Sequence, residues 1–151
     1  MPEHMYAVAI RWTGNLGNGT TSYRGYSRDH TIQAAGKEGI EGSADPAFRG
    51  DATRYNPEEL LVASLSTCHM LWFLHKCCEA GIVVEEYDDE PLGAMHEEAN
   101  GAGYFTSVVL RPKARFRAPV DDATLRQLHD ASHEYCFVAR SVNFPVTVEP
   151  R

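Results

Sequence analysis

A long helical segment in the middle of the chain constrains the fold more than any other feature. It begins at Asn56-Pro57-Glu58-Glu59, where Asn suits the cap, Pro the first helical position and the acids the first turn. After this start, no Gly or Pro occurs until Gly81. A helix over residues 56–80 would be roughly 35 Å long. Its apolar residues cover more than one face, which predicts a central helix packed against a sheet, another helix or a second subunit.

Short strand-like segments and a second helix surround this segment. Asp121-Asp122 opens the second helix, which carries Cys136 near its end. A stripe at helical spacing consists of Leu125, Leu128, Ser132, Tyr135 and Ala139. Gly36 to Tyr55 is expected to be irregular. The expected strands are 6–12, Thr20 to Arg24, His30 to Ala34, Ile82 to Tyr87 with a continuation to Met95, Tyr104 to Arg111 with an extension to Phe116, and Val142 to Val148. These elements predict one α+β domain over residues 1–151, an antiparallel sheet with two helices.

The composition excludes several classes of protein. With 43% hydrophobic and 23% charged residues the chain is ordinary for a globular domain. A formal net charge of -7 without a dense basic cluster argues against nucleic acid as a partner. No apolar stretch approaches the ~20 residues of a membrane span, so no membrane association is expected. The first residues lack the basic segment and apolar core of a signal peptide, so a cytoplasmic location is expected.

Two of the four cysteines, Cys68 and Cys136, are the candidates for reactive residues. In a reducing compartment four cysteines do not indicate a disulfide framework. Cys68 lies in mid-helix, where the helix dipole helps little, so a reactive Cys68 needs an activating side chain. A thiolate there could attack a peroxide and form a sulfenic acid, which Cys136 could convert to a disulfide if the two helices pack face to face. On spacing alone, two buried packing cysteines are the stronger interpretation.

An arginine held by a carboxylate would lower the pKa of a buried thiol. The candidate arginines precede the helix and are Arg24, Arg28, Arg49 and Arg54. Glu58 is the candidate carboxylate, although a first-turn acid also stabilises the helix dipole. Ten helical residues, about 15 Å, separate Glu58 from Cys68. An arginine bridge, a broken helix or a second subunit could connect them, and we hypothesise a dimer whose sites combine both chains.

These residues resemble a known family. The run Asn56-Pro57-Glu58-Glu59-Leu60, followed by Ala63 and Cys68 and much later by the helix with Cys136, is similar to the OsmC/Ohr family of osmotically inducible and organic hydroperoxide resistance proteins. The glycine-rich first hairpin and Phe48-Arg49-Gly50 also resemble it. The residues after Cys136 differ from the family's usual Cys-Pro form, and His69 to Trp72 differ from its usual aromatic-apolar run.

The resemblance implies a fold, an activity and residue roles. It implies an OsmC-like intertwined homodimer that reduces organic hydroperoxides and is recharged by a dithiol, such as a lipoylated protein. We expect no cofactor and no bound metal. Cys68 would be the peroxidatic cysteine and Cys136 the resolving one. Glu58 would orient the catalytic arginine, for which Arg49 is the first candidate, then Arg54, then Arg24 or Arg28. Apolar neighbours of Cys68 (Leu65, Leu71 and Trp72) would favour an organic peroxide, and Trp72 and His75 would narrow the pocket.

Two alternatives remain open. One is a redox-responsive or ligand-binding relative that keeps the fold without turnover. The other is a metal site, because His129, His133 and Cys136 share one helix face while His69, His75, Cys77 and Cys78 lie on the other helix. No established zinc motif is present, and Cys77-Cys78 is more typical of packing or of a surface thiol.

Overall fold

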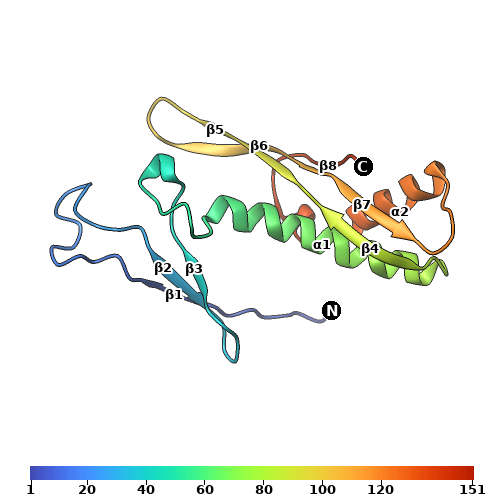
Figure 1. The fold of residues 1–151 in the computed structure, drawn as a ribbon, viewed down its shortest axis with the longest axis horizontal. Helices are drawn as coiled ribbons and strands as arrows, with labels where there is room; N and C mark the ends of the chain where they lie inside the picture. The colour runs from blue at the N-terminus through green and yellow to red at the C-terminus, as the bar shows by residue number, and fades with distance from the viewer. The chain divides into compact units, whose positions relative to one another are not determined.

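The start of the long helix is built by a reciprocal pair of hydrogen bonds. In the computed structural model, which describes all residues from 1 to 151, helix α1 covers Pro57–Glu79. The Glu59 amide donates to Asn56 Oδ1 (2.8 Å), and the Asn56 amide donates to Glu59 Oε1 (3.1 Å). This capping box satisfies amides that would otherwise lack partners, and Gly81 beyond the end has φ +71°. The predicted helix is confirmed at both ends (Figure 1).

Contacts along the chain define two compact units, Met1–Leu60 and Leu61–Arg151. The first unit contains an antiparallel sheet of β1 (Ala9–Trp12), β2 (His30–Gln33) and β3 (Ile40–Gly42), in that order. A short 3-10 helix, η1 (Pro46–Phe48), follows. The prediction of one domain over residues 1–151 stays a prediction.

The predicted strand from Thr20 to Arg24 is wrong. That segment is turn and bend, and β1 pairs instead with β2, so that Trp12 lies opposite His30. The Asn15 side chain accepts hydrogen bonds from the amides of Gly17 and Gly19, which have positive φ, and this holds the chain in a turn. The segment from Gly36 to Tyr55, predicted to be irregular, contributes β3 and η1.

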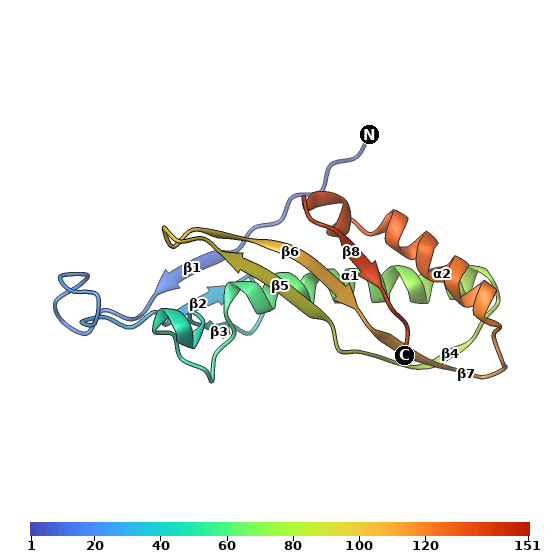
Figure 2. The ribbon, with the colours of Figure 1, turned by 90° about the horizontal axis from the view of Figure 1, so that it is seen from above.

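The second unit carries two sheets. β4 (Val84–Asp89) pairs antiparallel with β7 (Pro112–Phe116), while β5 (Leu92–Glu97), β6 (Gly103–Leu110) and β8 (Val146–Val148) form a sheet in the order β5-β6-β8. β5 and β6 are antiparallel, but β6 and β8 are parallel, which the sequence did not indicate. The α+β class is confirmed, with one parallel pair in otherwise antiparallel sheets (Figure 2).

Helix α2 (Asp122–Tyr135) starts at Asp121, whose carboxylate accepts from the Thr124 amide at 2.7 Å. The sequence placed Cys136 inside this helix, and that is wrong. The helix ends at Tyr135, and Cys136 has extended backbone angles (φ -66°, ψ 111°) while its amide donates to His133 O. A 3-10 helix, η2 (Ala139–Ser141), follows.

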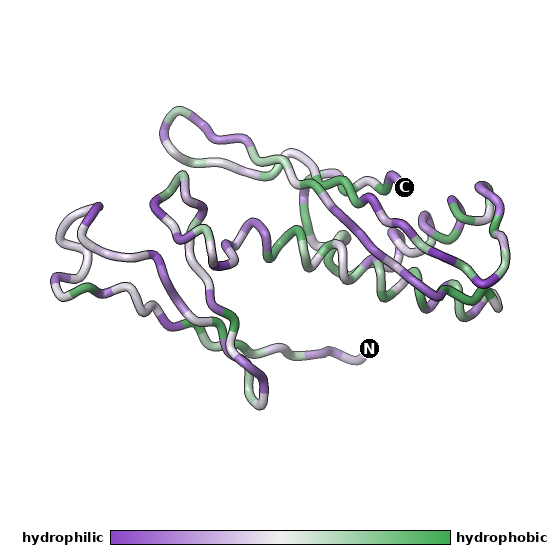
Figure 3. The backbone as a smooth tube through the Cα atoms, viewed as in Figure 1, coloured by the Kyte–Doolittle hydropathy of each residue, from purple (hydrophilic) through white to green (hydrophobic).

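The core of the second unit has two parts, and α1 contributes to both. Leu65 packs with Val108, Leu110 and Val146 of the three-stranded sheet. Phe73 and Cys77 pack with Leu128 of α2 and with residues of β4 and β7. In Figure 3, which has the view of Figure 1, green apolar stretches recur along α1, whereas β4 and β7 are mostly purple. The buried residues of α1 form a single stripe rather than covering the helix all round: Leu65, Ser66, His69, Phe73 and Cys77. Neither helix combines the length and the apolarity that a membrane span requires.

Candidate active site

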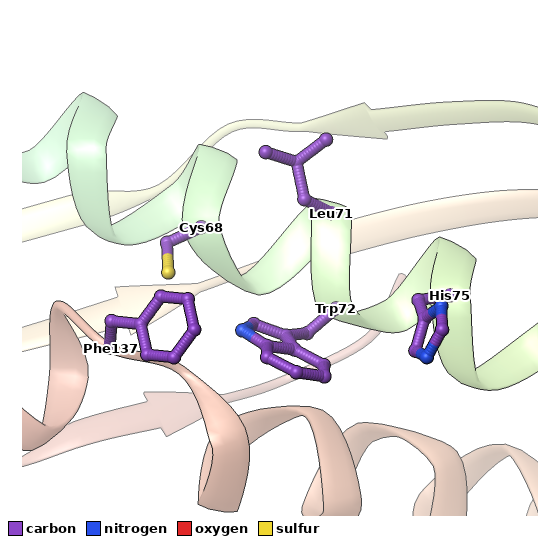
Figure 4. A pocket seen from close by; sticks show the side chains of 5 residues that line it. All are labelled: Cys68, Leu71, Trp72, His75 and Phe137. Atoms are coloured by element: carbon purple, nitrogen blue, oxygen red, sulfur yellow. The ribbon is translucent and has the colours of Figure 1, made fainter. Parts of the chain in front are cut away.

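A half-buried thiol on α1 opens into an apolar cavity. Cys68 lies on the side of the helix away from the buried stripe, at the wall of a cavity of about 290 Å³. The helical repeat brings residues three, four and seven positions later to the same wall. Figure 4 shows the Cys68 sulfur pointing toward the Phe137 ring, with the Trp72 indole beside it. The complete lining is Cys68, Leu71, Trp72, His75 and Phe137.

Cys136 meets Cys68 from the buried side. Only 1% of Cys136 is exposed, whereas Cys68 is partly accessible. Burial raises the pKa of the Cys136 thiol to about 11, and its hydrogen bond with the Cys68 thiol adds to that rise. The Ala139 amide donates to Cys136 Sγ at 3.4 Å and opposes the rise. The structure thus brings the two predicted thiols together within one chain, both of them reduced.

Aromatic rings form the rest of the cavity wall. The Trp72 ring meets Phe137 edge to face, with centroids 5.5 Å apart, and also lies 5.2 Å from Tyr135. Lys76 Nζ lies 4.0 Å from the centre of the Tyr135 ring. His75 stands at the rim, where its Nε2 is 3.5 Å from a Glu79 carboxylate oxygen. The prediction that Trp72 and His75 share the face of Cys68 is therefore confirmed.

Two residues of this region depart from the sequence prediction. Leu65 was expected beside the thiol, but it is fully buried in the core against the three-stranded sheet. Phe137 was not predicted, although it follows Cys136 directly, and with 68% of its surface exposed it can line the cavity. Its position depends on the helix ending at Tyr135, which the sequence did not reveal.

Glu58 belongs to a second cavity, in the first unit. This cavity of about 360 Å³ is also lined by Arg28, by His30 and by aromatic side chains including Trp12, Tyr26 and Phe48. The Arg28 guanidinium stacks on the Tyr26 and Tyr23 rings, 3.8 and 4.6 Å from their centroids. It also donates to the carbonyl oxygens of those two residues. Among the candidate arginines, Arg28 is the one that lines the cavity together with the predicted carboxylate.

The other candidate arginines have different surroundings. Arg49 caps η1 in the left-handed region (φ 65°), and its guanidinium lies 6.0 Å from the Tyr23 ring centroid. Arg54 Nε lies 3.5 Å from an Asp29 oxygen and 3.8 Å from an Asp51 oxygen. These carboxylates already balance the charge of Arg54. The assignment of Arg49 stays a prediction.

The residues proposed for a metal do not form a ligand set. No group of three or more His, Cys, Asp or Glu side chains is arranged to hold a metal ion. Cys77 is fully buried in the core and burial raises the pKa of its thiol to about 11, while Cys78 is exposed. His69 and His129, in contrast, share a buried hydrogen bond that the sequence did not predict.

The fold and the contact between the Cys68 and Cys136 thiols define the class: a small α+β protein with a pair of free cysteines at a cavity. The family model described as "OsmC-like protein" matches residues 50–151, and the chain belongs to this family. An OsmC-like protein of unknown function from Vibrio cholerae is 33% identical over 100% of both chains, with a TM-score of 0.87. No curated protein sequence matches the chain.

More distant structures share the fold. An organic hydroperoxide resistance protein from Elizabethkingia anophelis is 18% identical, with a TM-score of 0.71 over 99% of this chain and 100% of that one. The organic hydroperoxide resistance protein OhrB of Bacillus subtilis is also 18% identical, with a TM-score of 0.68 over 97% of this chain and 98% of that one. These similarities support the fold.

Proposed function

We propose that this protein is a thiol-dependent peroxidase that reduces organic hydroperoxides. The observation that carries the proposal is a pair of thiols in contact: Cys68 is accessible at the cavity wall, and Cys136 is buried behind it. This asymmetry suits two different roles. An accessible sulfur can reach a substrate, and a buried partner with a raised pKa stays protonated until the first sulfur has reacted.

The proposed chemistry has three steps. The Cys68 thiolate attacks one peroxide oxygen, the O–O bond breaks, and the alkoxide leaves and takes up a proton to become the alcohol. Cys68 is then a sulfenic acid, and Cys136 attacks its sulfur to form a disulfide with release of water. A dithiol reductant reopens the disulfide by exchange, and a lipoylated protein is the expected source of that dithiol.

The cavity supports an organic rather than an inorganic peroxide. Its walls beside the sulfur are Leu71, Trp72 and Phe137, which offer no hydrogen-bonding partner to a small polar peroxide apart from the indole N–H. Burying the apolar part of an organic hydroperoxide against these side chains stabilises its complex by about 25 cal/mol per Å².

Activation of Cys68 is the step assigned to Glu58 and an arginine. Because α1 is unbroken between Glu58 and Cys68, the proposal takes the carboxylate from the second subunit of the dimer: Glu58 of the partner subunit orients a guanidinium, which stabilises the thiolate and polarises the peroxide. The shared cavity of Arg28 and Glu58 supports Arg28, while Arg49 is retained as the second candidate. Arg28→Met and Arg49→Met distinguish them, because only loss of the activating guanidinium should reduce kcat/KM by about 100-fold or more.

We further propose that the protein works as a homodimer in the reducing cytoplasm. Exposed apolar side chains support the dimer, among them Leu71 and Phe137 beside the cavity and Leu92 and Met95 on β5. The four unpaired cysteines support a reducing compartment.

Turnover of cumene hydroperoxide with dihydrolipoamide tests the proposal. Cys68→Ser should abolish activity, Cys136→Ser should lose disulfide formation and accumulate over-oxidised Cys68, and Cys78→Ser, at an exposed thiol, should behave as wild type. Full activity of Cys68→Ser would show that the proposal is wrong.

A second candidate is a redox-responsive protein without turnover. The raised pKa of Cys136 favours it, because a thiol that stays protonated is slow to resolve an oxidised partner. In that case one equivalent of peroxide would oxidise Cys68 slowly, and added dithiol would not produce steady turnover.

A further inference from the structure

Two histidines meet in the buried contact between the helices of the second unit. His69 of α1 and His129 of α2 are each 1% exposed. His69 Nε2 and His129 Nδ1 lie 3.0 Å apart, and the ring planes differ by only 9°. On its other side, the His129 ring stacks on Phe73 with centroids 4.3 Å apart. This is the only hydrogen bond between side chains of α1 and α2.

The surroundings of the pair are poor in compensating charge. On α2, His133 faces His69, and Arg126 acts on His129. On β4, Asp89 acts on His69, but its carboxylate already accepts hydrogen bonds from the Ser66 hydroxyl and the Arg111 amide. Nδ1 of His69, Nδ1 of His133 and the Tyr87 hydroxyl are buried without a partner. An added proton on the pair would therefore find little stabilisation nearby.

One histidine of the pair is the neighbour of a thiol along the chain, and the other lies on the helix that leads to the second thiol, seven residues before Cys136. His69 follows Cys68 in α1, and α2 ends at Tyr135, immediately before Cys136. We propose that the neutral His69–His129 hydrogen bond is a positioning contact, which sets the alignment of α1 and α2 that holds the Cys68 and Cys136 thiols together, and that acid releases it. The relevance of this alignment to peroxide turnover rests on the proposed function, but the alignment itself does not.

The direction of the acid effect follows from proton counting. One neutral imidazole donates and the other accepts, and one added proton still leaves a donor and an acceptor between the rings. Two imidazolium rings 3.0 Å apart, in contrast, would present two donors and two positive charges to each other, so the second proton breaks the contact. Burial, followed by the charge of His133, lowers the pKa of His69 to about 4. Burial, followed by the charge of His69, lowers the pKa of His129 to about 3. The unfolded chain binds protons near the ordinary value of 6.5, so the contribution of the pair is complete above that pH and is lost as the pH falls toward 4.

The test measures thiol alignment without any peroxide. Wild type, His129→Leu and His129→Gln are equilibrated at pH 7.5 with glutathione and its disulfide, in Cys77→Ala/Cys78→Ser backgrounds. Forming one Cys68–Cys136 disulfide consumes one glutathione disulfide and releases two glutathione molecules. The equilibrium constant is the effective concentration of one thiol relative to the other. The proposal expects about a tenfold loss in His129→Leu, which cannot make the hydrogen bond, and at most about a threefold change in His129→Gln, which can.

A second measurement isolates the acid release. NMR titration of the wild-type imidazoles should show two histidines titrating below pH 5. The effective concentration of the Cys68 and Cys136 thiols should fall below pH 5 in wild type but not in His129→Gln. His96→Gln, at an exposed histidine on β5 outside the Cys68 cavity, is the matched control and should change neither quantity. An unchanged effective concentration in a folded His129→Leu, or titration of both buried histidines near pH 6.5, would overturn the proposal. If His129→Leu does not fold, the wild-type titration and the Gln variant still decide it. These readouts stand even if the peroxidase assay fails.

Discussion

Helix α1 has two faces that carry similar residue types in different surroundings. On one face a cysteine, an aromatic residue and a histidine line an open cavity: Cys68, Trp72 and His75. On the other face the same three types are buried in the core: Cys77, Phe73 and His69. The sequence of the helix is apolar on both sides, so residue type does not separate the faces. What separates them is the sheet and the second helix, which cover only one face within the chain.

The comparison teaches that accessibility decides what each thiol can do. Burial alone raises the pKa of Cys77 to about 11, and its neighbours are core side chains. Cys68 has the same helical environment but opens to the cavity and touches Cys136. We therefore expect substitutions on the core face to change stability and substitutions on the cavity face to change reactivity.

The largest expected effect is that of Phe73→Ala on the core face. Phe73 is fully buried between α2 and the β4–β7 pair and stacks on His129, so its removal leaves a cavity. The free energy of unfolding should fall by about 3–5 kcal/mol. His75→Ala, at a position on the cavity face whose side chain is 57% exposed, should change it by no more than about 0.5 kcal/mol. Urea denaturation of the two variants measures both, and equal losses would contradict the division into faces.

Adjacent cysteines give the next comparison. Cys77→Ser places a hydroxyl in the apolar cluster of Phe73 and Leu128 and should lower the free energy of unfolding by about 1–3 kcal/mol. Cys78→Ser, one residue later and exposed, should be nearly neutral. Thermal unfolding gives the order of the two variants, and native iodoacetamide labelling should modify Cys78 well before Cys77. Rapid labelling of Cys77 would show that the core opens there.

Local signals explain what the sequence predicted. The start of α1 depends on side chains within one turn, Asn56 to Glu59, so the capping box was readable from the sequence. The common face of Cys68, Trp72 and His75 follows from the helical repeat alone. The wrong strand at Thr20 to Arg24 has a non-local cause. The strand that pairs with β1 begins only at His30, after a long turn, and no local signal marks that distance.

Tertiary packing explains what the sequence did not predict. Phe137 lines the cavity because α2 stops before Cys136, and no Gly or Pro marks that end. The histidine pair joins two residues sixty positions apart, and they meet only because the two helices pack together. The sequence could not single out the arginine proposed to activate Cys68, because four candidates precede α1. The structure places one of them, Arg28, at the wall of a cavity that Glu58 also lines.

The smallest effect predicted here concerns selectivity on the cavity face. Trp72 presents its ring beside Cys68 and packs on Phe137 and Tyr135. Trp72→Ala should lower kcat/KM for cumene hydroperoxide by about tenfold, because an aryl substrate loses apolar contact at the wall. The rate with hydrogen peroxide, which has no apolar part to bury, should change by less than about twofold.

Trp72→Phe is the matched control, because a smaller aromatic ring keeps part of the wall and should retain most of the preference. The measurement is the ratio of kcat/KM for cumene hydroperoxide to kcat/KM for hydrogen peroxide. It is taken from steady-state kinetics on variants whose thermal unfolding is close to that of wild type. An equal loss for both peroxides would mean that Trp72 acts on the thiol itself and not on the substrate. In that case the cavity face would control reactivity through the position of Cys68, and the apolar wall would no longer explain a preference for organic peroxides.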